Sequence, residues 1–177
     1  LDKTGTLTEG KPTLTTLVSA PGASETELIQ VAGDLALASE HPLSQAILAG
    51  IRARGGTVSP AAQFRSIPGE GISGEVHGRN AVLGNEKALQ RWDISVAPLS
   101  HSAETLRVQG QSVVFVAFDG KLLGQLGISD RVKDASREAV RSLQKEGVRV
   151  IMLTGDTRST AEAVARDLGI TEIFPEA

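Results

Sequence analysis

The stretch Val-Arg-Val-Ile-Met-Leu-Thr-Gly-Asp at residues 148–156 decides the fold class. Residues 148–153 are apolar except for Arg149, which is typical of a strand buried in a parallel sheet, and a Thr-Gly-Asp loop follows. Apolar spacing predicts an amphipathic helix on either side of the strand, over 134–146 before it and over 161–168 after it. A helix, a strand, a loop and a helix in this order indicate an α/β sheet covered on both faces.

A second α/β signal stands at the other end of the chain, where residues 1–10 read Leu-Asp-Lys-Thr-Gly-Thr-Leu-Thr-Glu-Gly. Asp2 and the residues after it fit the junction between a strand and a loop. Because α/β signals stand at both ends and a different pattern lies between them, we predict one domain over 1–17 and 121–177. An inserted domain is predicted over 18–120.

The inserted segment has the pattern of an α+β domain. One helix is predicted to begin after Ser24, and another to have Pro42 in its first turn. Short apolar runs separated by glycines follow, and Asp119-Gly120 between two such runs predicts a hairpin. We therefore expect an antiparallel sheet flanked by helices. Its strands are predicted at 64–67, 72–76 and 81–83, and its later helices at 86–92 and 102–108. The two strands of the hairpin are predicted at 113–118 and 122–128.

Composition excludes several classes of function. The 177 residues carry a net charge of −3 and only 3% aromatic residues, which argues against a nucleic-acid binder. Because the sequence has no cysteine, these residues form no disulfide, zinc–thiolate site or thiol nucleophile. No apolar run approaches the roughly 18–20 residues of a membrane-spanning helix. The chain opens directly on a motif and without methionine, so we expect it to be a piece of a longer protein.

Asp2 carries the chemistry expected at the amino-terminal loop. A carboxylate at the carboxyl end of a strand can attack phosphorus and form an acyl phosphate. Lys3 or a magnesium ion would neutralise the surrounding charge. Gly5 would let the backbone turn closely around a phosphate, whose oxygens the hydroxyls of Thr4 and Thr6 would hold. The alternative interpretation is a surface Asp-Lys pair beside a threonine-rich turn.

Five motifs together resemble those of the heavy-metal P-type ATPases, which are cation pumps with a haloacid-dehalogenase-like phosphorylation domain. DKTGT at 2–6 is similar to the phosphorylation motif of that family, and TGD at 154–156 to the second motif of the same domain. SEHPL at 39–43 is most similar to the copper(I) members. GEG at 69–71 and GN at 84–85 resemble nucleotide motifs of this branch. The matches run in family order across essentially the whole chain.

The resemblance implies an incomplete haloacid-dehalogenase-like phosphorylation domain with an inserted nucleotide-binding domain, and it implies ATP and Mg²⁺ as cofactors. Asp2 would take the γ-phosphoryl group of ATP. Its carboxylate and the main-chain carbonyl of Thr4 would bind Mg²⁺. Thr154 and Gly155 would hold the transferred phosphate, and Asp156 would orient that loop.

In the inserted domain the resemblance implies an adenine site at His41, whose ring can stack on a purine or form a hydrogen bond to it. Gly69 and Gly71 would let the backbone approach the base and phosphates. Asn85, after Gly84, would form a hydrogen bond to the ribose. The alternative is a capping histidine among ordinary turn glycines.

One position departs from the family pattern. Family members often carry a glutamate five residues before the motif histidine, and Ala36 stands there in this chain. Glu40 is a candidate substitute, at a different geometry. We therefore expect weaker discrimination for adenine.

Thr4 favours a pump over a phosphatase. Related phosphatases carry a second aspartate at this position as general acid–base, and threonine cannot deprotonate water. An aspartyl phosphate should therefore hydrolyse slowly here, as a pump requires. Two alternatives remain: a soluble haloacid-dehalogenase-like phosphatase and a non-catalytic nucleotide-binding module.

The resemblance also implies partners that these residues do not include. They are the transmembrane and actuator domains of a pump, with this part on the cytoplasmic face of a membrane and copper(I) as the expected ion, bound elsewhere. A further lysine and a GDGxND-like motif of the complete domain are not among the 177 residues. We therefore expect the chain itself to bind nucleotide with little or no ATPase activity. For Asp130 and Lys133 two interpretations are left open: a role near the nucleotide, or a solvated cluster of charges.

Overall fold

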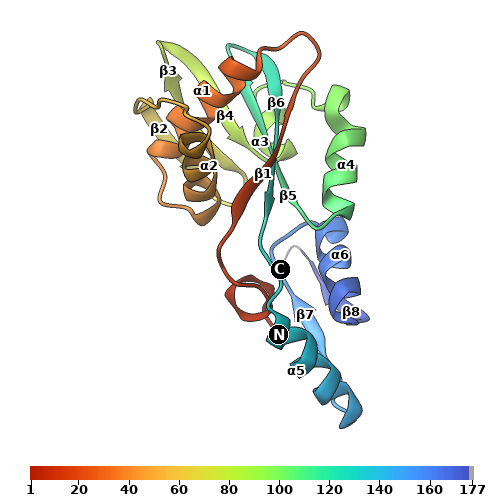
Figure 1. Ribbon diagram of the computed structural model, residues 1–177. Helices are drawn as coiled ribbons and strands as arrows, with labels where there is room; N and C mark the ends of the chain where they lie inside the picture. The colour runs from red at the N-terminus through yellow and green to blue at the C-terminus, as the bar shows by residue number, and fades with distance from the viewer. Residues whose placement is uncertain (176–177) are drawn as a thin grey trace. The chain divides into compact units, whose positions relative to one another are not determined.

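The computed structural model describes residues 1–175 (Figure 1). Its contacts divide the chain into two compact units, which we describe one at a time. The sheet unit comprises Thr13–Ala103 and Val113–Ile128. The terminal unit comprises Leu1–Pro12, Glu104–Ser112 and the chain from Ser129 onward.

The sheet unit is built on six strands in the order β1-β6-β5-β4-β3-β2. β2 pairs antiparallel with β3, β3 with β4, and β4 with β5. The turn from β5 to β6 has Asp119 at φ 50° and Gly120 at φ 75°, the positive values of a tight two-residue hairpin, so the predicted hairpin is confirmed. The strands are β1 (Thr13–Ser19), β2 (Ala62–Ile67), β3 (Gly71–Val76), β4 (Arg79–Gly84), β5 (Ser112–Phe118) and β6 (Lys121–Ser129).

Helices pack against both faces of this sheet. Alternate residues of β5 face opposite sides: Val116 joins the core made with α1 and α2, and Phe115 joins the core made with α3. The side chain of Ser24 accepts the Glu27 N–H and caps α1, and Pro42 stands in the first turn of α2, as predicted. The helices are α1 (Glu25–Leu37), α2 (Pro42–Ala53), α3 (Glu86–Gln90) and the short η2 (Ala97–Leu99). A further helix, α4 (Ser100–Val108), begins in this unit, and its residues from Glu104 onward belong to the terminal unit.

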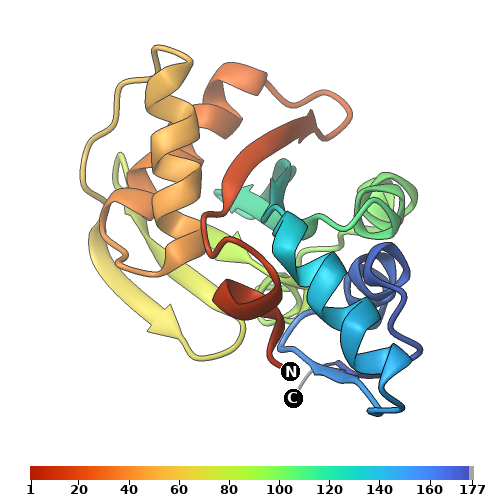
Figure 2. The same ribbon diagram turned by 60° about the horizontal axis from the view of Figure 1, so that its bottom comes forward.

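The terminal unit is a small parallel α/β arrangement. β7 and β8 pair in parallel, and Asp2 forms a further parallel bridge with Leu153. Figure 2 shows the first residue beside these strands, where the Leu1 nitrogen donates to the Ile151 carbonyl at 2.6 Å. α5 and α6 pack around the fully buried Met152. The elements are a turn, η1 (Lys3–Leu7), α5 (Asp134–Lys145), β7 (Ile151–Leu153), α6 (Arg158–Leu168) and β8 (Glu172–Phe174).

The predicted fold class is confirmed, with a parallel α/β part and a large antiparallel sheet flanked by helices. The strand predicted over 148–153 is shorter, because the turn after α5 takes its first residues. Gly147 has φ 78° there, and the Val148 N–H donates to the Leu143 carbonyl at 2.9 Å. No helix among residues 1–175 has the length and apolarity needed to cross a bilayer.

The compact units do not follow the predicted boundaries. β1 was not predicted; it lies beside β6 at the edge of the sheet, so the boundary at 17/18 falls inside a strand. The boundary at 120/121 separates β6 from its own sheet, and residues 104–112 cluster with the terminal unit. The assignment of a phosphorylation domain and a nucleotide-binding domain to 1–17, 121–177 and 18–120 stays a prediction.

Candidate functional site

Asp2 lies beside the carboxyl end of β7, where Thr154 follows the strand. The Leu153 N–H donates to the Leu1 carbonyl at 2.8 Å, and Asp2 forms its bridge with Leu153. The Asp2 side chain is exposed, and its carboxylate has no hydrogen-bond or ion-pair partner within residues 1–175. The predicted nucleophile is therefore open to a ligand at the edge of the sheet where such ligands bind.

Lys3 forms an ion pair with Asp156, not with Asp2. The two side chains are 7% and 20% exposed, so the pair is largely withdrawn from water. The sequence made Lys3 a candidate to neutralise the charge around Asp2, but the structure gives this cation to another carboxylate. Because Lys3 belongs to DKTGT and Asp156 to TGD, the pair joins the two motifs.

Asp156 is the centre of a hydrogen-bond network. Its Oδ2 also accepts from Thr154 Oγ1 at 3.2 Å, and the Asp156 N–H donates to the Thr154 hydroxyl at 3.2 Å. Its Oδ1 accepts from Ser112 Oγ at 3.1 Å, a partner that the sequence analysis did not find. In the described part of the chain the Gly155 N–H donates to no residue. The Thr154 hydroxyl is thus engaged inside the loop, and the Gly155 N–H is available to an anion.

The DKTGT turn is held by two side chains that are distant in the sequence, Asp130 and Lys133. Gly5, at φ 78°, donates its N–H to Thr8 Oγ1 at 3.2 Å. The Thr8 hydroxyl donates to Asp130 Oδ2 at 2.5 Å. The Lys133 ammonium donates to the Gly5 carbonyl at 2.7 Å. Asp130 and Lys133, whose role the sequence left open, therefore both fasten this turn.

His41 is the N-cap of α2. Its Nδ1 accepts the Leu43 N–H at 3.2 Å, and its carbonyl accepts the Gln45 N–H at 3.0 Å. The capping reading of His41 thus applies, and the ring is exposed at the same time. The Gln45 amide donates to the Ser39 carbonyl at 2.6 Å and closes the SEHPL turn.

Asn85 is held by hydrogen bonds inside the protein. Its Oδ1 accepts the Ala88 N–H at 3.1 Å as the cap of α3, and its Nδ2 donates to the Gly69 carbonyl at 3.0 Å. Gly71 and Gly84 face each other across β3 and β4. A Cβ on Gly71 would lie 2.3 Å from the Leu83 carbonyl oxygen, so the strands themselves require glycine there. At Gly69 a Cβ would meet no atom within 4 Å, so this glycine borders open space.

Glu70, between the two motif glycines, forms a bidentate pair with Arg91. Arg91 Nε donates to Glu70 Oε2 at 2.5 Å and Nη2 to Oε1 at 2.6 Å. These hydrogen bonds hold the pKa of Glu70 below its ordinary value, because they stabilise the charged carboxylate. The pair fastens the turn before β3 to the end of α3.

Ala36 and Glu40 differ in their access to a ligand. Ala36 is completely buried in α1 and packs in the core, so no ligand reaches this position. Glu40 is exposed next to His41 and has no ion-pair partner within the described residues. Of the two positions, only Glu40 can contact a bound molecule.

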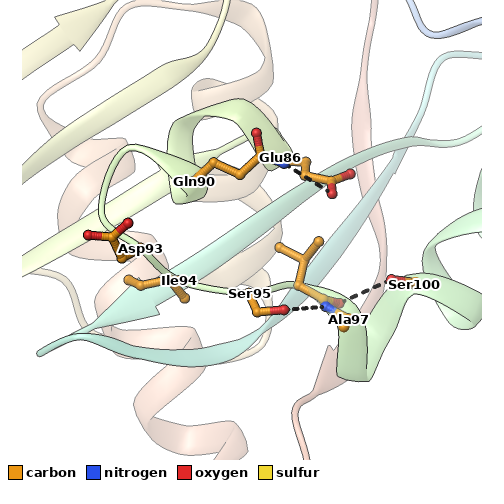
Figure 3. A pocket seen from close by; sticks show the side chains of 8 residues that line it. Glu86, Gln90, Asp93, Ile94, Ser95, Ala97 and Ser100 are labelled. Carbon is orange, nitrogen blue, oxygen red and sulfur yellow. Dashed lines mark hydrogen bonds between the residues drawn. The ribbon is translucent and has the colours of Figure 1, made fainter.

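A pocket of about 350 Å³ lies in the sheet unit beside α3 (Figure 3). Figure 3 shows the carboxylates of Glu86 and Asp93 and the amide of Gln90 around it. None of the predicted nucleotide residues lines this pocket, although Glu86 follows Asn85 directly. Of those residues, Glu40, His41 and Gly69 are exposed, Gly71 and Asn85 are half-buried, and Gly84 is buried.

A family model for haloacid dehalogenase-like hydrolases matches residues 1–177. The chain belongs to the haloacid dehalogenase-like hydrolases. The chain is 43% identical to the silver exporting P-type ATPase of Salmonella typhimurium, over 98% of the chain and 21% of that protein. It is 42% identical to copper-transporting ATPase 2 of Rhizobium meliloti (strain 1021), over 99% of the chain and 21% of that protein. The chain thus spans about a fifth of the length of these relatives.

Solved structures agree with these relatives. A zinc-transporting PIB-type ATPase in its E2.Pi state is 31% identical to this hydrolase with a TM-score of 0.72, over 99% of the chain and 28% of that structure. The catalytic domain of a CPx-ATPase shares the fold with a TM-score of 0.72 at 20% identity, over 99% of the chain and 59% of that domain. The resemblance to heavy-metal P-type ATPases that the motifs indicated is confirmed.

The residues of the DKTGT turn fit a Mg²⁺ ion that is shared with a phosphate. The Asp2 carboxylate is unpaired, and Thr4 and Thr6 are exposed beside it. Within residues 1–175 no three carboxylate or imidazole side chains gather as a metal site. Mg²⁺ commonly takes one or two protein oxygens and completes its shell with water and substrate phosphate. Asp2 and the carbonyl of Thr4 are the oxygens that would hold it.

Proposed function

We propose that this chain is the ATP-binding and phosphorylation part of a heavy-metal-transporting P-type ATPase with copper(I) as its ion. In that pump it lies on the cytoplasmic face of the membrane and works with transmembrane and actuator domains. Relatives that are 43% and 42% identical, a silver-exporting and a copper-transporting ATPase, support this assignment. The observation that carries it is the unpaired Asp2 carboxylate beside the Thr154 loop.

The proposed reaction is phosphoryl transfer from ATP to Asp2. A carboxylate oxygen of Asp2 forms a bond to the γ-phosphorus, the bond from that phosphorus to the β,γ-bridging oxygen breaks, and ADP leaves with this oxygen. Mg²⁺ would supply charge neutralisation between the carboxylate and the phosphates. The chain's own contribution is positioning: the Gly155 N–H is available to a phosphate oxygen, and the Lys3–Asp156 pair keeps the two motif loops together.

Thr4 separates the proposed pump from a phosphatase. The side chain at this position is a hydroxyl, which is too weak a base to activate water against an aspartyl phosphate. A long-lived phosphoenzyme follows, and a pump needs one because a conformational change must occur before hydrolysis.

The Asp2→Asn variant tests the proposal in the full-length protein. We expect wild type to incorporate the γ-phosphate of labelled ATP into an acid-stable, hydroxylamine-sensitive bond, and the variant to incorporate less than about 1% as much, because an amide does not displace ADP. The measurement is label retained on the protein after acid quenching.

Asp119→Asn is the matched control, because Asp119 lies in the exposed β5–β6 turn and asparagine also accepts its positive φ. It should label like wild type. Label that survives in Asp2→Asn would overturn the assignment of the nucleophile. Rapid turnover of a small phosphate ester without stimulation by metal would instead support the soluble phosphatase, and ATP binding without label a non-catalytic module.

A further inference from the structure

Ser112 reaches the TGD loop from outside every motif found in the sequence. Its hydroxyl donates to Asp156 Oδ1 at 3.1 Å, across 44 residues of sequence. Ser112 is the first residue of β5 and is half-buried. The hydroxyl therefore serves the side chain that holds Lys3 and Thr154 through its other oxygen.

The turn that carries Ser112 is fastened to the same part of the structure by a second bond. Thr160, in α6 and only 1% exposed, donates its hydroxyl to the Gln111 carbonyl at 3.1 Å. Gly110, at φ 80°, brings the chain round against Ala163 of α6. Ser112 therefore approaches Asp156 from a turn of defined geometry, not from a free loop.

We propose that Ser112 is a positioning residue of the phosphorylation site, which fixes the rotation of the Asp156 carboxylate. This inference rests on the proposed function. A carboxylate with both oxygens satisfied has one favoured orientation. With Ser112 on Oδ1, Oδ2 stays directed at Lys3 and Thr154. Without that donor, a partly buried oxygen lacks a partner and competes for the same two donors.

The consequence reaches Asp2 through Lys3. Lys3 directly follows the nucleophile, and its ammonium is held by Asp156. A carboxylate free to rotate would loosen both the Lys3 contact and the Thr154–Asp156 turn. Ser112 is also the last residue of the terminal unit before the chain enters the sheet unit. Its hydroxyl therefore holds this end of the segment to the TGD loop.

The direct test is amide hydrogen exchange of this chain without nucleotide. The Asp156 N–H, bound to the Thr154 hydroxyl, reports on the turn. We expect Ser112→Ala to speed its exchange on the order of fivefold to tenfold, as the net contribution of one partly exposed hydrogen bond predicts. Ser112→Thr, which keeps the hydroxyl, should restore wild-type exchange. Ser142→Ala, an exposed serine of α5, is the control and should change nothing at Asp156.

A second readout separates positioning from nucleotide binding in the full-length protein. Ser112→Ala should lower the rate of Asp2 labelling about tenfold and leave the KM for ATP unchanged, and Ser112→Thr should recover the rate. Unchanged exchange at Asp156 in Ser112→Ala, or a rise in KM alone, overturns the role of Ser112. Absence of label in wild type would overturn the proposed function, while the exchange result still decides the role of Ser112.

Discussion

His41 has a structural task on one ring nitrogen, and the nucleotide contact that we propose for it would use the rest of the ring. Nδ1 accepts the Leu43 N–H and caps α2. In a neutral imidazole the other nitrogen then carries the proton, so we assign the Nε2–H tautomer from this hydrogen bond. The exposed ring thus offers a donor at Nε2 to a purine, and it cannot offer Nδ1 as well.

Two substitutions of His41 separate these tasks. His41→Asn keeps a good N-cap and removes the ring, so we expect unchanged stability and at least tenfold weaker ATP binding. His41→Ala removes both, so it should also lose about 1 kcal/mol of unfolding free energy. Calorimetric titration with ATP and urea unfolding measure the two quantities. His77→Asn, at another exposed histidine, serves as the control. Wild-type ATP affinity in His41→Asn would remove His41 from the nucleotide site.

At this scale the sequence indicated which residues to examine but not their partners. Asn85 was expected at a ribose, yet its amide holds Gly69 and caps α3. Lys3 was expected to serve Asp2, yet it pairs with Asp156. Ser112 gave no signal at all. Lys3 and Ser112 both reach Asp156 from a distant part of the chain, and spacing within a motif carries no information about such a contact.

Secondary-structure elements were predicted well where a local signal marks their ends. α1 begins after the capping Ser24, α2 carries Pro42 in its first turn, and Asp119-Gly120 turns β5 into β6. β1 (Thr13–Ser19) was missed because its burial alternates poorly, with mostly half-buried residues at the edge of the sheet. Its place beside β6 in the sheet supplies what the local pattern lacks.

The ion pair between Glu70 and Arg91 joins the turn before β3 to the end of α3, and its contribution to stability depends on pH. The pKa of Glu70 is lowered in the folded state, so its contribution to stability is present above the unfolded pKa and is lost as pH falls through the folded pKa. We expect Arg91→Gln to raise the pKa of Glu70 towards its ordinary value of 4.5. NMR titration of the side-chain carboxyl carbon measures it. Arg79→Gln, which breaks an exposed pair with Asp119, should leave it unchanged; an identical titration in Arg91→Gln would contradict the assigned cause.

At the scale of the whole molecule, the buried apolar residues form cores that the two units do not share. Met152 belongs to the core of the terminal unit, and Leu126 to a core of the sheet unit. Both side chains are completely buried, so replacing either with alanine should cost about 2–5 kcal/mol. Because the cores share no residue, that cost should fall mainly on one unit.

Unfolding in urea, followed residue by residue in NMR spectra, tests this. Met152→Ala should lower the free energy of unfolding measured at residues of α6 and leave the value measured at residues of α1 within about 0.3 kcal/mol of wild type. Leu126→Ala should have the opposite pattern. Exposed Ala139→Gly in α5 should cost about 1 kcal/mol, in the terminal unit alone. Equal shifts of both units in both core variants would show one cooperative unit instead.

The alternation of the units along the chain has a practical consequence. The backbone passes between them after Pro12, after Ala103, after Ser112 and after Ile128. A unit formed by one continuous segment could be produced alone by cutting the chain at two points. The sheet unit consists of two segments, separated by residues 104–112 of the terminal unit, so two cuts do not isolate it. A recombinant polypeptide cut to 13–128 would contain residues 104–112 without Asp156 and Thr160, to which they are bonded in the intact chain. Measurements on that polypeptide would therefore include a segment that has lost its partners.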